Sequence, residues 1–311
     1  MIRSARSSIG RPALVPIVAL LAAACSTAPA PSPGATGAPP SPAPSQGPTI
    51  TPAPSASTAA ALILRVTSEG GFIGPSATLA TIPTVSVYAN GEILTPGPVA
   101  AVYPAPLLPG VTVTNVGPKG AEAIVAAIRA AGLDKPFSGD PGVGNPDSGE
   151  TVFTVTLDGT TTITRLHLGG GGPGLPGGLG GSPDPARDAA QQLLEQLEDT
   201  TQTWGSTPVV SAYVPTAYRV FVAPGAPSND GATDLPAVAW PLATPLDTFG
   251  TPAVPDRGIA GLRQGVVFGA DAATLGPVLQ AASQVTAFES GGKPYTLYVR
   301  PLLPDEVPAK G

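Results

Sequence analysis

His167 is the only histidine in the chain, so a serine-type catalytic triad or a zinc site would have to include it. The other parts of such sites are missing, because the sequence contains no G-x-S-x-G elbow and no second imidazole to share a metal ion. The alternating pattern places His167 on a strand, on the same face as Ile163 and Arg165, with no acidic neighbour there to orient its ring. We therefore predict a structural or surface histidine and no catalytic residue.

Two other patterns match chemical motifs only in part. Ser290 and Lys293 have the S-x-x-K spacing of serine acyl-enzymes, but that motif needs a helix to bring the lysine beneath the serine. Gly291-Gly292 between them indicates a turn instead. The stretch Gly169–Gly181 is rich in glycine but lacks the G-K-[ST] that reaches nucleotide phosphates, so it is interpreted as an insertion between two elements. No cofactor is predicted.

One predicted loop concentrates side chains whose oxygen atoms could bind calcium. These side chains are Asp140, Asn145, Asp147 and Glu150. Their spacing differs from that of an EF-hand, and two prolines interrupt the loop. The favoured interpretation is a solvated loop without metal, and a calcium site is the alternative.

The beginning of the sequence is typical of a signal peptide. Arg3, Arg6 and Arg11 give a positive leader, and the apolar stretch Ala13–Ala24 follows it. That stretch is too short to span a bilayer, which takes roughly 20 residues. Residues 1–24 are therefore predicted to be removed when the protein is exported.

Cys25 is the only cysteine, and it follows this leader directly. The segment Leu21–Cys25 resembles a bacterial lipobox, in which the peptidase cuts before the cysteine and a lipid is attached to its thiol. Ala22 departs from the usual pattern, which has leucine three residues before the cysteine. We predict lipidation at Cys25 and a location on the outer face of the cell membrane. The alternative is ordinary signal-peptide cleavage after Ala24.

Composition divides the rest of the chain of 311 residues into two parts. Residues 25–58 combine the lipidated cysteine with a linker rich in proline, serine and alanine, which cannot bury enough apolar surface to fold. Residues 59–311 are predicted to form a single extracytoplasmic domain. The net charge of −6 and the absence of a basic run exclude nucleic acid as a partner. The membrane is thus reached through the lipid alone.

Local patterns in this domain predict hairpins and helices. The predicted hairpins turn at Asn90-Gly91, Asp158-Gly159 and Gly291-Gly292. The predicted helices are Pro118–Gly132, Pro185–Glu198 and Ala272–Ser283, the last capped by Asp271. Further strands are predicted at Ala61–Thr67, Ala217–Ala223 and Gly265–Phe268, and Leu235–Pro255 is predicted to be a loop. This order indicates a loop-rich α+β fold, with a mostly antiparallel sheet built from hairpins and about three helices packed on it.

Aromatic side chains offer the one weak indication of a binding surface. The residues concerned are Tyr88, Tyr103, Trp204, Trp240 and Tyr298, with Tyr295 beside them. They could line a groove for a ligand or a partner, but the favoured interpretation is that most of them pack in the core and at its margins.

Several short motifs give the chain a family character. They include Gly70-Gly71-Phe72, Tyr88-Ala89-Asn90-Gly91, Tyr103-Pro104-Ala105-Pro106, Trp240-Pro241 and Val299–Glu306. With these motifs the chain resembles a group of secreted lipoproteins of actinobacteria and similar high-GC bacteria, to which no activity is assigned. The resemblance implies an extracytoplasmic location and one continuous domain, and it transfers no catalytic residue.

These observations favour one function class over two others. A non-catalytic module of the cell envelope that binds a small ligand or a protein is favoured. The alternatives are a structural or accessory envelope protein without a small ligand, and a hydrolase. A deep apolar pocket would indicate a ligand, whereas an exposed apolar patch would indicate a protein partner.

Overall fold

The computed structural model describes residues 60–71, 74, 77–99, 101–142, 149–168, 184–228, 235–255 and 257–308. The predicted signal peptide, Cys25, the linker and the glycine-rich stretch lie outside these residues, as do Phe72, Asn145 and Asp147. The α+β class with mostly antiparallel strands is confirmed, and the strands divide between two sheets.

The first sheet has seven strands in the order β6-β5-β1-β2-β3-β4-β7, and every neighbouring pair is antiparallel. Its strands are β1 (Leu62–Glu69), β2 (Val85–Tyr88), β3 (Glu92–Pro96), β4 (Val111–Asn115), β5 (Glu150–Leu157), β6 (Thr160–Leu166) and β7 (Val209–Ala212). β1 is an interior strand between β5 and β2, so the first strand of the domain is paired on both sides.

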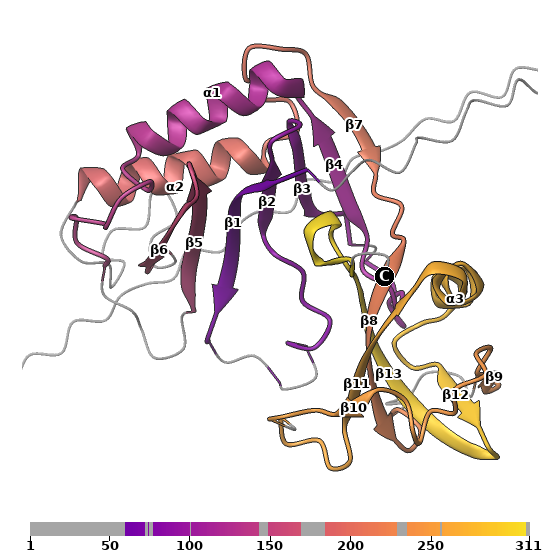
Figure 1. Cartoon of the computed structure of the whole chain (residues 1–311). Helices are drawn as coiled ribbons and strands as arrows, with labels where there is room; N and C mark the ends of the chain where they lie inside the picture. Colours follow the sequence, from indigo (N-terminus) through magenta and orange to yellow (C-terminus); the bar gives the residue numbers. More distant parts are fainter. Residues whose placement is uncertain are drawn as a thin grey trace, which may run out of the picture. The chain divides into compact units, whose positions relative to one another are not determined.

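Two helices cover one face of this sheet, α1 (Gly117–Ala130) and α2 (Pro185–Glu198) (Figure 1). Ile124 and Ile128 of α1 and Leu193 of α2 are buried in one cluster with strand residues such as Val85 and Phe153. Side chains on a strand alternate between its faces, so Ser86 and Tyr88 of β2 lie on the opposite face of the sheet. Leu303 and Asp305 contact Tyr88 on that opposite face, as described below.

The second sheet has six strands in the order β10-β11-β8-β13-β12-β9. Its strands are β8 (Ala217–Pro224), β9 (Val238–Ala239), β10 (Thr251–Pro252), β11 (Arg263–Phe268), β12 (Ala287–Ser290) and β13 (Lys293–Pro301). All neighbours are antiparallel except β9 and β12, which are parallel. α3 (Gly269–Ala281) packs on this sheet through Leu275 and Leu279, and the single turn η1 (Pro304–Glu306) ends the fold.

The three predicted hairpins and the three predicted helices are confirmed, and the ends of α1 and α3 differ from the prediction. Gly91 adopts a φ of +85° in the β2–β3 turn, where a Cβ atom would collide with the Gly117 carbonyl oxygen, so only glycine fits. α2 has its predicted limits because the Asp184 side chain accepts hydrogen bonds from the Ala186 and Arg187 backbone N–H groups. α1 ends at Ala130, two residues earlier than predicted.

The α1 end is a Schellman motif. The N–H of Gly132 donates to the Arg129 carbonyl, and that of Leu133 donates to the Ile128 carbonyl. Gly132 has a φ of +70° and therefore follows the helix instead of belonging to it.

The sequence analysis was wrong at one helix start and missed two strands of the first sheet. It also predicted Leu235–Pro255 to be a loop, whereas the short strands β9 and β10 lie within it. α3 begins at Gly269, and Asp271 lies in its first turn instead of capping it. The missed strands are β4 and β7, which pair with each other. The alternation of Val111 and Val113 in β4 was a local signal for a strand. β7 reads Val-Val-Ser-Ala and does not alternate, and all four of its residues are exposed, so neither face had to be apolar.

Candidate interaction surface

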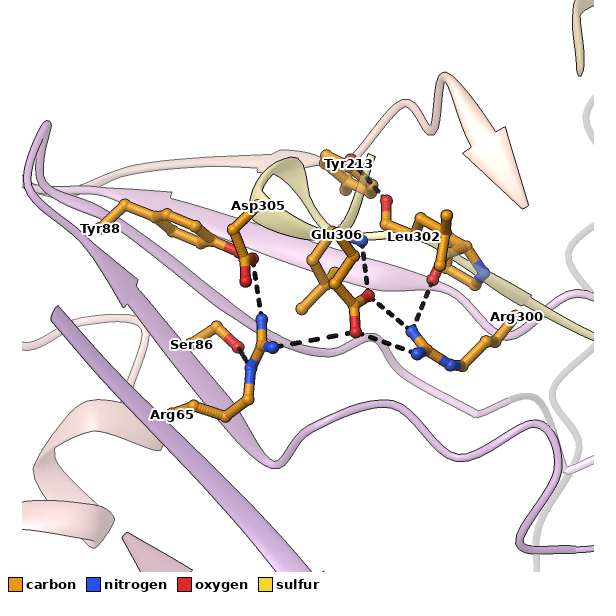
Figure 2. A network of polar contacts seen from close by, with 10 residues as sticks. Arg65, Ser86, Tyr88, Tyr213, Arg300, Leu302, Asp305 and Glu306 are labelled. Atoms are coloured by element: carbon orange, nitrogen blue, oxygen red, sulfur yellow. Dashed lines mark hydrogen bonds and ion pairs between the residues drawn. The ribbon is translucent and has the colours of Figure 1, made fainter. Parts of the chain in front are cut away.

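The last described segment of the chain returns to the first sheet and is held there by ion pairs (Figure 2). Asp305 Oδ1 lies 2.8 Å from Nη2 of Arg65 on β1, and the Tyr88 hydroxyl donates to the same oxygen at 2.6 Å. Arg300 on β13 contacts the two carboxylate oxygens of Glu306 at 2.6 and 2.9 Å. We call these five residues the C-terminal clamp, because they join the first strand to the final turn.

Apolar contacts accompany the clamp. Leu303 is buried with Tyr88, Leu94 and Val111, on the face of the first sheet opposite α1 and α2. The Tyr213 hydroxyl donates to the Leu302 carbonyl at 2.8 Å. The motif Val299–Glu306, which the sequence singled out, thus has a structural task within the domain.

Burial and the two arginines set the ionisation of the clamp. Burial by itself would raise the pKa of Glu306, but its hydrogen bonds from Arg300 and from the Leu303 N–H lower that pKa below the ordinary value. Burial and the Asp305 hydrogen bond raise the pKa of Tyr88 far above the ordinary value of a phenol. Glu306 is therefore charged and Tyr88 neutral at neutral pH, and both are bonded to partners inside the clamp.

We expect the domain to lose stability as the pH falls through the acidic range. The pKa of Glu306 is lower in the folded chain than its ordinary value of 4.5, so the unfolded chain binds the proton more readily. The contribution of Glu306 is present above that ordinary value and is lost as the pH falls through the folded pKa. Urea unfolding at about pH 7 and about pH 3.5 measures this loss. The loss should be smaller in Glu306→Gln, and an equal loss in the variant and the wild type would contradict the assignment.

His167 lies opposite Glu150 in the β5–β6 hairpin, since Thr151 pairs with Leu166. Its Nε2 is 3.6 Å from the Glu150 carboxylate, which Arg165 also contacts at 3.3 Å. Its Nδ1 is buried and has no hydrogen-bond partner among the described residues. The sequence analysis considered only the strand of His167 and therefore missed this carboxylate. The hairpin register set by Asp158-Gly159 would have revealed this carboxylate. A carboxylate alone does not make His167 a catalytic base, because a base also needs a nucleophile beside the ring.

The structure places the candidate aromatic residues in separate clusters. Tyr88 belongs to the clamp, and Trp204 is buried in the core beneath α1 and α2. Trp240 is buried in the core of the second sheet, Tyr298 packs on a third cluster, and Tyr103 is exposed. The five residues thus lie in different parts of the domain and not around one groove. Most of them contribute to cores that are built from different parts of the sequence.

The remaining candidate motifs have structural positions. Ser290 and Lys293 face each other across the β12–β13 turn, as predicted, and the Ser290 hydroxyl accepts the Leu246 N–H at 3.1 Å. Asp140 accepts the Gly142 N–H at 3.0 Å, and its other oxygen is 3.7 Å from Arg187. Across the ranges that the structure describes, no group of three or more His, Cys, Asp or Glu side chains could hold a metal ion.

A pocket of about 540 Å³ lies between β11 and the start of α3. Its lining is mainly apolar and includes Leu242, Phe249 and Phe268. Thr244 and Asp271 supply its only polar side chains among the described residues. Such a lining offers contact area but no set of groups arranged for proton transfer or nucleophilic attack.

The outer edge of β7 is the most exposed apolar feature of the first sheet. β7 pairs with β4 on one side, and no strand in the described part of the chain pairs with its other side. Val209 and Val210 are 65% and 51% exposed, and Val214 just beyond the strand is 76% exposed. Residues 207–216 contain no charged side chain. Lysine and other charges are the usual protection of an edge strand against pairing with another chain.

The other three sheet edges differ from β7. β6 carries Arg165, which forms ion pairs with Glu69 and Glu150. β9 and β10 have only two residues each, and β10 contains Pro252. Short strands, charges and prolines all limit edge pairing. β7 is therefore the edge best suited to receive an additional strand.

Comparison of the chain with protein-family models, with curated proteins and with solved structures gives no match. Its function must be argued from the geometry described above. Within the described ranges, no helix is both long enough and apolar enough to cross a membrane.

Proposed function

We propose that this chain is a lipid-anchored protein on the outer face of the cell membrane, and that its domain binds a protein partner without catalysis. The observation that carries the binding part is the exposed, uncharged edge of β7 with its valines. Extended segments of partner proteins commonly bind by adding a strand to such an edge. The membrane part rests on the leader and Cys25.

The chemistry of the polar clusters supports binding over catalysis. The charged groups of the C-terminal clamp are directed at one another, and Tyr88 is kept neutral by burial and by Asp305. Such a network stabilises a fold but offers no activated nucleophile or base. In the pocket beside α3, Asp271 is the single ionisable side chain among the described lining residues, with no second titratable group to share acid–base chemistry. A structural or accessory role in the envelope would use the same edge for the same kind of contact.

Replacing Cys25 by serine is expected to release the protein from the membrane. The wild type should sediment with membranes and carry acyl mass on its mature N-terminal cysteine, because stable anchoring needs more than one acyl chain. The variant should lose this mass, and its membrane-bound fraction should fall by roughly tenfold or more. Serine is nearly the same size as cysteine but lacks the thiol. A variant that stays with the membranes, together with an unacylated wild type, would overturn the proposed anchor.

A further inference from the structure

We propose that the partner of the β7 edge is the β7 edge of a second copy of this chain, paired antiparallel about a two-fold axis at Ser211. The inference rests on the proposed function for its membrane setting, and on the hydrogen-bond geometry of β7 for its partner.

The orientation of the backbone shows which groups are free at this edge. The Tyr213 N–H donates inward to the Val111 carbonyl, and successive residues of a strand point their N–H and C=O groups to opposite sides. The backbone N–H and C=O groups of Ser211 therefore also point toward β4, whereas those of Val210 and Ala212 point outward. On either side of Ser211, these two residues direct backbone donors and acceptors to the side of β7 where no strand of the described ranges pairs.

This arrangement is complementary to itself. When a second β7 is turned about an axis through Ser211, Val210 of one copy faces Ala212 of the other, and the reverse pair forms at the same time. About four backbone hydrogen bonds result. The two Ser211 residues then form a pair without backbone hydrogen bonds, with Cα atoms ~4.5 Å apart.

The side chains and the flanking residues fit a second copy. Ser211 and Ala212 are small, so two edges can approach closely, and the segment has no charge that would repel an identical segment. Pro208 and Pro215 flank the strand and limit pairing to the residues between them. Because both copies carry these prolines, the two paired segments have equal length.

Attachment to one membrane raises the effective concentration of the two copies, which a contact as small as the β7–β7 pairing needs. Four hydrogen bonds and a few valines bury far less surface than the roughly 1,600 Å² of a standard stable interface. The pairing should therefore be weak in dilute solution. Two copies tethered to one membrane meet at a much higher effective concentration, which favours the dimer.

Cysteine cross-linking in membranes of cells that produce the full-length protein tests the pairing. Ser211→Cys places two thiols at the two-fold axis, within the Cα separation of about 4.4–6.8 Å that a disulfide requires. On mild oxidation it should form a disulfide dimer. In Val209→Cys on the same strand, the Cα atoms of the two cysteines would lie roughly 13 Å apart, so this variant should not cross-link. Ile163→Cys on the β6 edge is the control for exposure, since Ile163 is 60% exposed.

A second pair of variants tests whether the yield of this disulfide depends on the β7 edge. Val210→Lys, added to Ser211→Cys, should reduce the dimer yield by roughly fivefold or more, because each copy would then place a charge on the paired edge, with the two lysines diagonal to each other on the same face. Ile163→Lys, added to Ser211→Cys, should leave the yield unchanged. Circular dichroism confirms that each variant is folded.

The outcomes separate this inference from the proposed function. Equal cross-linking by Ser211→Cys and Ile163→Cys, or by Ser211→Cys and Val209→Cys, would overturn the two-fold pairing. If the Ser211→Cys variant cross-links to a different envelope protein, the second copy is overturned as partner and the proposed function stands. An unacylated chain that does not sediment with membranes would instead overturn the proposed function, whatever the cross-linking yields.

Discussion

Glu306→Ala is expected to lower the free energy of unfolding by about 2–4 kcal/mol. The substitution leaves Arg300, whose side chain is 14% exposed, without its carboxylate partner, whereas Arg65 keeps its ion pair with Asp305. Because Arg300 lies on β13, the final turn loses this attachment to the strand, and the Leu303 N–H loses its acceptor. Removing one partner of a buried pair costs more than the pair itself contributes, because a charge stays buried without compensation.

Urea unfolding measures this effect, and two further variants make it specific. Glu122→Ala removes an exposed carboxylate on α1 and should change the stability by less than about 0.5 kcal/mol. In Arg300→Ala with Glu306→Ala the loss should be smaller than the sum of the two single losses, because each single variant already breaks the same ion pair. Additive losses, or a loss in Glu306→Ala no larger than in Glu122→Ala, would show that the clamp does not stabilise the domain.

Trp240→Ala should destabilise the domain by about 3–5 kcal/mol. The indole packs edge-on against Phe249 and Phe288, with ring centroids 6.0 and 6.4 Å away, and its Nε1–H donates to the Thr244 carbonyl at 2.8 Å. Truncation leaves a large cavity in the core of the second sheet and an acceptor without its donor. Trp240 is only 9% exposed, so its main effect should be on stability.

Tyr103→Ala is the matched control for Trp240→Ala, because Tyr103 is the exposed one of the five candidate aromatic residues. Tyr103→Ala should change the free energy of unfolding by less than about 0.5 kcal/mol, since Tyr103 is 60% exposed. Thermal and urea unfolding of the two variants provide the test. A loss below about 1 kcal/mol for Trp240→Ala would mean that the indole does not hold this core together.

The sequence by itself determined the local elements of the domain. Asn90-Gly91 and Asp158-Gly159 specify tight turns because few residues adopt the backbone conformations that these turns require. Asp184 and Pro185 fixed the start of α2, since the cap satisfies N–H groups within the same turn of chain. Even the Glu150–His167 contact follows from a local register. All these interactions join residues that are close in sequence.

Only the tertiary structure decided the division into two sheets, the clamp and the free edge. Arg65 and Asp305 are 240 positions apart, and no local pattern indicates which of the charged residues will meet at such a separation. The exposure of Val209 and Val210 has the same origin, because a valine-rich strand is equally suited to a buried position. β7 is exposed because the sheet ends there, and the end of a sheet is set by how all its strands pair.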